Sequence, residues 1–138
     1  MKKLKDVWKS EKHTIIDLGD DEFTVGKPHP MIDYSTRNKR ILAEANDSET
    51  AVILLDIVLG YGSNMDPLAE ILPVLKEVKK ITSRQKRYLP IVCSVTGTEK
   101  DPQNRTTVAA ALEADGVLVL ESNAAASNLA KFLIEKKR

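Results

Sequence analysis

Apolar runs and amphipathic repeats alternate along most of the chain. Residues 50–60 (TAVILLDIVLG), 89–97 (LPIVCSVTG) and 116–121 (GVLVLE) are almost wholly apolar. Such runs are typical of strands that are covered on both faces, as in a parallel sheet. We therefore expect each run to form a buried strand.

The segments next to these runs place their apolar residues at the spacing of one helix face. They extend from Thr36 to about Asn46, from Pro67 through Val78, from Pro102 to about Ala114, and from Asn123 towards the end of the chain. Ser35, Asp66 and Asp101 are suited to cap the first three of these helices. Proline suits a first helical position because its missing N–H has no helical partner there.

The N-terminal part has a different pattern. Residues 1–12 are polar and are predicted to form a tail, while residues 13–138 form one domain. Residues 13–19 (HTIIDLG) have the β-branched content of a short strand. Residues 20–35 contain two prolines and a glycine, so we expect an irregular loop.

Alternation of strands and helices with short connections predicts right-handed βαβ units and a parallel sheet between layers of helices. In such a sheet the carboxyl ends of the strands share one edge, where ligands bind. Three predicted loops, 60–66, 96–101 and 121–123, lead from this edge into helices. Helix N-termini attract phosphate and carboxylate groups.

The composition of these loops predicts an anion site at the strand ends. Glycine lets the backbone approach a charged group, and serine, threonine and asparagine add donors. The predicted binding residues are Gly60, Tyr61, Gly62, Ser63, Asn64, Thr96, Gly97, Thr98 and Asn123. A second interpretation stays open, because βα turns use the same residue types for turn geometry and capping.

Three further residues are candidates for chemistry. His29 lies between two prolines and could serve as an acid, a base or a phosphoryl acceptor, or could only fix its loop. Asp56 interrupts an apolar run, which indicates either a site residue or a structural hydrogen-bond acceptor. Cys93 lies within a predicted strand, where a thiol usually behaves as a small buried hydrophobe. We predict catalytic roles for Asp56 and His29 and no metal site.

Charge and cysteine content narrow the classes of function. Twenty-one basic and twenty acidic residues leave a net charge of +1, which gives no overall attraction to nucleic acid or to an anionic membrane. A single cysteine excludes an internal disulfide and a multi-cysteine metal site. The sequence has neither a signal-peptide pattern nor an apolar run long enough to span a bilayer, so we expect a cytoplasmic protein.

Three segments carry a family resemblance. HTIIDLGDDEFTVGKPHPMID (13–33), VILLDIVLGYG (52–62) and VTGTEKDPQ (95–103), in this order and spacing, resemble the C-terminal part of the FdrA family of acyl-CoA synthetase-like proteins. More distantly, the chain is similar to the CoA-ligase domain of succinyl-CoA synthetase. The resemblance implies a flavodoxin-like three-layer α/β sandwich with a mainly parallel sheet of four to five strands.

The resemblance also implies a function. It indicates a domain or subunit that binds a phosphorylated acyl or CoA substrate, so CoA or an acyl phosphate is the expected ligand. The turn at 60–62 corresponds to the one that, in the synthetases, precedes a helix facing a phosphohistidine. The alternatives are a component of a carbamoyl-transfer enzyme acting with oxamate, a non-catalytic assembly module and, by fold analogy alone, a flavin or nucleotide binder.

Two departures from the family restrict these expectations. Residues 95–103 contain no histidine, and the chain has no nucleotide-binding module, so we expect no complete synthetase reaction from it alone. The first strand and helix of the family domain are absent, and in a flavodoxin-like order that strand lies between the second and third. We therefore expect a homo-oligomer, a missing segment, or a partner subunit that carries the strand and the nucleotide-binding module.

Overall fold

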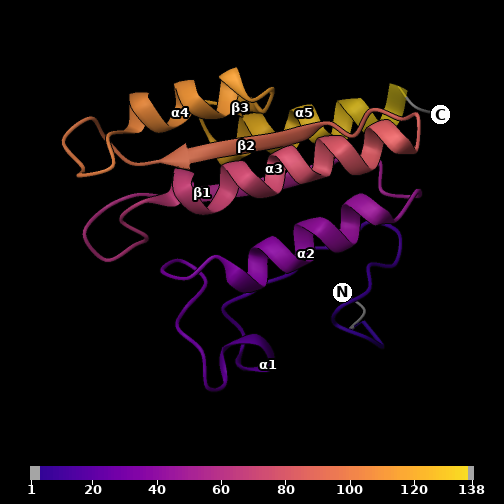
Figure 1. Ribbon diagram of the computed structural model, residues 1–138, viewed down its shortest axis with the longest axis horizontal. Helices are drawn as coiled ribbons and strands as arrows, with labels where there is room; N and C mark the ends of the chain where they lie inside the picture. Colours follow the sequence, from indigo (N-terminus) through magenta and orange to yellow (C-terminus); the bar gives the residue numbers. More distant parts are fainter. Residues whose placement is uncertain (1–3, 137–138) are drawn as a thin grey trace.

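The computed structural model describes residues 4–136 and shows an α/β domain with three strands (Figure 1). The strands are β1 (Ile53–Val58), β2 (Ile91–Thr96) and β3 (Leu118–Leu120). The helices are α1 (Asp21–Thr24), α2 (Ser35–Asn46), α3 (Pro67–Arg84), α4 (Arg105–Ala114) and α5 (Asn123–Lys136). The predicted α/β class with a parallel sheet is confirmed.

The sheet has the order β1-β2-β3, and both pairings are parallel. Side chains alternate between its two faces, as the pleat requires. Ile53 and Ile57 of β1 and Cys93 of β2 enter the main core together with residues of α2, α3 and α4. Helix α5 contacts all three strands. Figure 1 shows α3 in front of β2 and α5 behind it, so the helices form two layers around the sheet.

The number of strands differs from the expected four to five. The sheet of the described chain has three strands, because residues 13–18 form no ladder with β1. Residues 116–121 do contribute a strand, but it is limited to Leu118–Leu120. A β-branched sequence becomes a strand only where a neighbouring backbone accepts and donates its hydrogen bonds. Residues 13–18 have no such neighbour within the described chain.

Two local predictions also need correction. The loop at 20–35 contains one helical turn, α1, which Asp20 caps by accepting a hydrogen bond from the N–H of Glu22. Helix α2 begins at Ser35 and not after it, and the Asp33 carboxylate accepts the Ser35 N–H at 2.7 Å. This hydrogen bond holds the pKa of Asp33 below its usual value. In contrast, Asp66 caps α3 as predicted, and α3 continues through Pro73.

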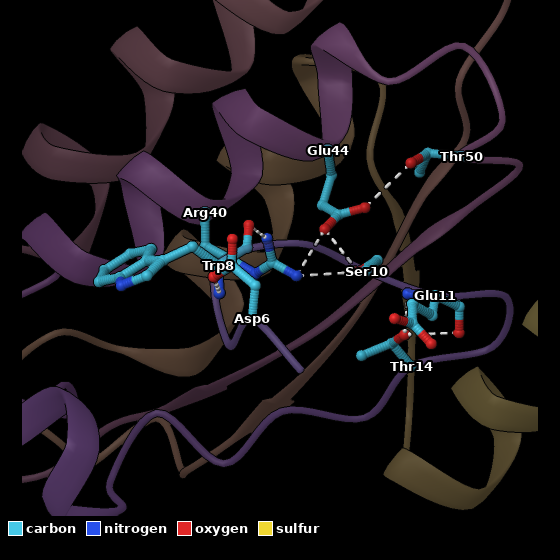
Figure 2. A network of polar contacts seen from close by, with 8 residues as sticks. All are labelled: Asp6, Trp8, Ser10, Glu11, Thr14, Arg40, Glu44 and Thr50. Carbon is cyan, nitrogen blue, oxygen red and sulfur yellow. Dashed lines mark hydrogen bonds and ion pairs between the residues drawn. The ribbon is translucent and has the colours of Figure 1, made fainter. Parts of the chain in front are cut away.

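The N-terminal segment is attached to α2 by a polar network around Arg40 (Figure 2). The Arg40 guanidinium donates to the carbonyl of Trp8 and, at 2.9 Å, to Oγ of Ser10. It also forms an ion pair with Glu44 at 2.9 Å, and Thr50 donates to the same carboxylate. The predicted boundary after residue 12 stays a prediction, but residues on its N-terminal side are packed against the domain.

Candidate functional site

The ends of the strands lie at one edge of the sheet. In the register, Val58 is opposite Thr96, and Leu120 is opposite Ser94. The loops that follow the strands therefore start from neighbouring positions at this edge, which we call the carboxyl edge. Figure 1 shows the first two loops side by side beyond the strand ends.

A buried glutamine joins the first two loops. The N–H of Gly60 donates to Oε1 of Gln103 at 3.0 Å, and Nε2 of Gln103 donates to the carbonyls of Gly60 and Asn64, both at 2.9 Å. Sequence reasoning missed this residue because it placed the start of the helix that is α4 in the structure at Pro102. The helix starts at Arg105, capped by Asn104, which leaves Gln103 in the loop.

Ser63 and Asn64 are buried and serve the structure of the first loop. Oγ of Ser63 donates to the carbonyl of Gly60 at 2.9 Å. Nδ2 of Asn64 donates to the carbonyl of Ile32 and to the carboxylate of Glu70, and its Oδ1 accepts the N–H of Asp66. These contacts agree with the second interpretation of the loop, in which small polar residues serve turn geometry and capping.

The N-terminus of α3 already has negative charge beside it. Asp66 accepts the N–H of Ala69 at 3.1 Å, and Glu70 lies in the first turn. Glu70 also accepts the N–H of Tyr34 at 3.0 Å. Carboxylates at this end offset part of the positive end of the helix dipole. A ligand bound at the carboxyl edge would therefore depend more on individual backbone N–H groups than on this dipole.

The three glycines of the predicted site differ in whether the fold requires glycine at their positions. Gly60 has a φ of 125°, which side chains rarely allow. At Gly97 a Cβ atom would lie 2.8 Å from Cβ of Leu59, so packing excludes a side chain. Gly62 has neither constraint, because a Cβ atom there would have no atom within 4 Å. The fold needs glycine at the first two positions, while Gly62 leaves its exposed backbone open to a ligand.

The other predicted binding residues lie at the surface of the same edge. The N–H and hydroxyl of Thr98 both donate to the Asp101 carboxylate, at 2.6 and 3.1 Å. Tyr61 is 85% exposed, and Thr96 and Asn123 are also exposed. Asn123 is the first residue of α5, whose first turn is capped by Oγ of Ser122.

His29 and Asp56 are brought together in a different place. Both line a cavity of about 280 Å³ between β1 and residues 16–19. Asp17 also lines this cavity. Nδ1 of His29 accepts the N–H of Met31 at 3.1 Å, and Nε2 lies beside Gly19, where an added Cβ atom would be 2.8 Å from it. Asp56 is exposed, so the burial expected from its apolar neighbours is not found. Its strand lies at the edge of the sheet.

Arg37 connects this cavity with the core. Its guanidinium lies 4.3 Å from the centre of the Tyr34 ring, a cation–π contact. Its Nη1 is buried without a hydrogen-bond partner in the described part of the chain. Burial raises the pKa of the Tyr34 phenol, which keeps the ring neutral. An unpaired buried donor of a cation is costly and points to a missing acceptor.

Burial raises the pKa of the Cys93 thiol to about 12, an effect that Arg37 opposes and Asp56 reinforces. Because the folded-state pKa exceeds the unfolded one, this stabilising contribution is complete below about pH 9 and is lost as the pH rises towards 12. We expect the stability advantage over Cys93→Ala, measured by urea unfolding, to shrink above pH 9. A constant difference up to about pH 10.5 would contradict the burial of the thiol.

Comparisons with known proteins identify the family. The sequence model of the CoA-ligase family matches residues 1–133. The chain therefore belongs to the CoA-ligase family, which confirms the resemblance to CoA-ligase domains. A curated relative, the uncharacterized protein YahF of Escherichia coli (strain K12), is 42% identical over 134 residues. This match covers 97% of the chain but 26% of YahF, so the chain spans about a quarter of its relative's length.

The described helices also bear on membrane insertion. Among residues 4–136, no helix combines the length and the apolar character that crossing a bilayer requires.

Proposed function

We propose that the chain is the CoA-ligase-type domain of an FdrA-type, acyl-CoA synthetase-like enzyme, and that it binds a phosphorylated acyl or CoA substrate at the carboxyl edge. The family supports the chemical class of the substrate. The parallel sheet supports the proposed position, because it starts the three loops from neighbouring strand ends.

Gly62 is the observation that supports this position best. It is exposed, its backbone conformation does not demand glycine, and its Cβ position faces open space. Glycine at such a position is explained when a ligand approaches the backbone closely. Tyr61 beside it and Asn123 at the start of α5 are exposed at the same edge and would add contacts. Gln103 keeps the first two loops together and acts as a positioning residue.

A substitution at Gly62 tests the proposal. Gly62→Val should leave the unfolding transition within about 0.5 kcal/mol of the parent, because the Cβ position is open. It should weaken binding of CoA, acetyl phosphate or carbamoyl phosphate by about tenfold or more, measured by calorimetric titration of the full chain. Ser83→Ala, at the other end of α3, is the control. Equal affinities for the parent and Gly62→Val would place the ligand elsewhere.

The same titration separates the candidate reactions. Preference for CoA or acetyl phosphate supports acyl-CoA chemistry, and preference for carbamoyl phosphate supports the carbamoyl-transfer alternative. Residues 95–103 contain no histidine, so a phosphohistidine of the synthetase type would have to come from outside this stretch. We therefore propose that the domain works as a subunit and that Asp56 and His29 assist proton transfer only in the assembled enzyme. Binding of none of these ligands would favour an assembly module.

A further inference from the structure

A channel follows the free edge of β1. Its first part, a cavity of about 550 Å³, is lined by residues 12–16 on one side and residues 49–55 on the other. Its second part is the 280 Å³ cavity, between residues 16–19 and residues 54–58. Five residues, Ile16, Leu18, Arg37, Leu54 and Leu55, line both cavities. A water molecule takes about 30 Å³ of liquid, so the channel has room for a peptide segment.

The backbone of β1 presents unpaired groups to this channel. Ile53 and Leu59 donate their N–H groups towards β2, to the carbonyls of Pro90 and Thr96. Because N–H directions alternate along a strand, Leu54, Asp56 and Val58 direct their N–H groups to the opposite side. No described residue forms a strand on that side. This edge has no proline or lysine, and Asp56 is its one charged residue, so most of it is a template for strand addition.

The far wall of the channel runs in the same direction as β1. Lys12 and Thr14 line the part near Thr50, and Asp17 and Gly19 line the part near Asp56. Both walls run in the same direction, and helices cover one face of the sheet. A strand between the two walls would therefore complete a parallel sheet. Its end would arrive beside His29 and Asp56.

Side chains around the channel also lack contacts that an inserted segment would supply. Ile15 is 85% exposed and Leu54 is 40% exposed, although both are apolar. Nη1 of Arg37, which lines both cavities, is buried without an acceptor. A carbonyl group of an added backbone would satisfy this donor.

A second copy of this chain is a poor source of the strand. In each copy residues 12–19 stand beside the edge of β1, and β3, the other edge, has three residues. The relative YahF, in contrast, has about three quarters of its length outside the match, because the match covers 26% of it. A polypeptide equivalent to that remainder has ample length to supply a strand and a helix.

We propose that the channel receives a parallel β-strand from a partner polypeptide equivalent to the part of YahF that this chain does not match. The strand pairs with Leu54, Asp56 and Val58 of β1 on one side and with residues 13–18 on the other. A helix that follows it covers Leu54 beside α5, because the opposite face at Ile53 and Ile57 is already buried. The proposal is independent of the ligand at the carboxyl edge.

Hydrogen exchange tests this proposal with a defined probe. The full chain is mixed with a YahF variant from which the matching stretch is deleted, and amide exchange is followed residue by residue. We expect exchange at Leu54, Asp56 and Val58 and along residues 13–18 to slow by at least about tenfold on binding. Unchanged exchange at these amides, with or without binding elsewhere, would overturn the proposal. So would protection of β1 that depends only on the concentration of this chain, since a second copy would then be the occupant.

Matched variants separate the channel from the rest of the surface. Ile15→Asp places a charge in the channel at a side chain that is 85% exposed, so the chain should fold normally. Val25→Asp makes the same change at a side chain that is 82% exposed and lines neither cavity. We expect Ile15→Asp to weaken binding of the YahF variant at least about tenfold and Val25→Asp to leave it unchanged. Equal binding by both would refute the channel as the docking site.

Discussion

Replacing Arg40 with methionine is expected to lower the free energy of unfolding by about 3 kcal/mol. Arg40 is 6% exposed and joins the N-terminal segment to α2 through the carbonyl of Trp8, Oγ of Ser10 and the Glu44 carboxylate. Methionine retains much of the apolar volume but removes every one of these hydrogen bonds. The Glu44 carboxylate, whose side chain is 16% exposed, loses its ion-pair partner in a largely desolvated place.

Urea unfolding measured in the parent and the variant checks this expectation. Lys39→Met is the control, because Lys39 is an exposed neighbour on the same helix and its replacement should change stability by less than about 0.5 kcal/mol. Proteolysis gives a second readout, since the segment around Trp8 should become the first site of cleavage in Arg40→Met. A loss below about 1 kcal/mol would mean that the network in Figure 2 is solvated and adds little.

Replacing Gln103 with leucine is expected to destabilise the chain by about 2–3 kcal/mol and to weaken ligand binding at the carboxyl edge. The substitution leaves the N–H and carbonyl of Gly60 and the carbonyl of Asn64 without the partner that Gln103 provides. Gln103 is 9% exposed, so water replaces the amide poorly. The first two loops of the edge then lose the side chain that holds them together.

The unfolding transition and the calorimetric titration check the two effects separately. Gln103→Glu is informative because it keeps an acceptor for the Gly60 N–H but faces two carbonyls with a carboxylate, so it should also destabilise. Lys100→Leu, at an exposed position of the same loop, is the control for the hydrophobic change. Unaltered affinity in a destabilised Gln103→Leu would show that loop positioning does not matter for binding.

The candidate site shows where sequence reasoning stops. The alternation of strands and helices predicted the position of the edge, because parallel strands place their ends together whatever the side chains are. It did not separate the roles of the loop residues. Asn64 and Gln103 have structural partners in distant segments, and Ser63 is bonded within its own loop. At Gly62, in contrast, a Cβ atom would have no atom within 4 Å. The binding and catalytic assignments therefore stay predictions.

The sequence by itself determined the α/β class, the parallel βα units from residue 50 onward, the Asp66 cap of α3 and the family. These features depend on local periodicity, capping chemistry and characteristic segments, all of which are written along the chain. Tertiary structure alone decided that residues 13–18 form no strand, that Asp56 is exposed and that His29 lies near it. Strand pairing and burial depend on what stands beside a segment in space, and at the free edge of β1 no strand of the described chain occupies that place.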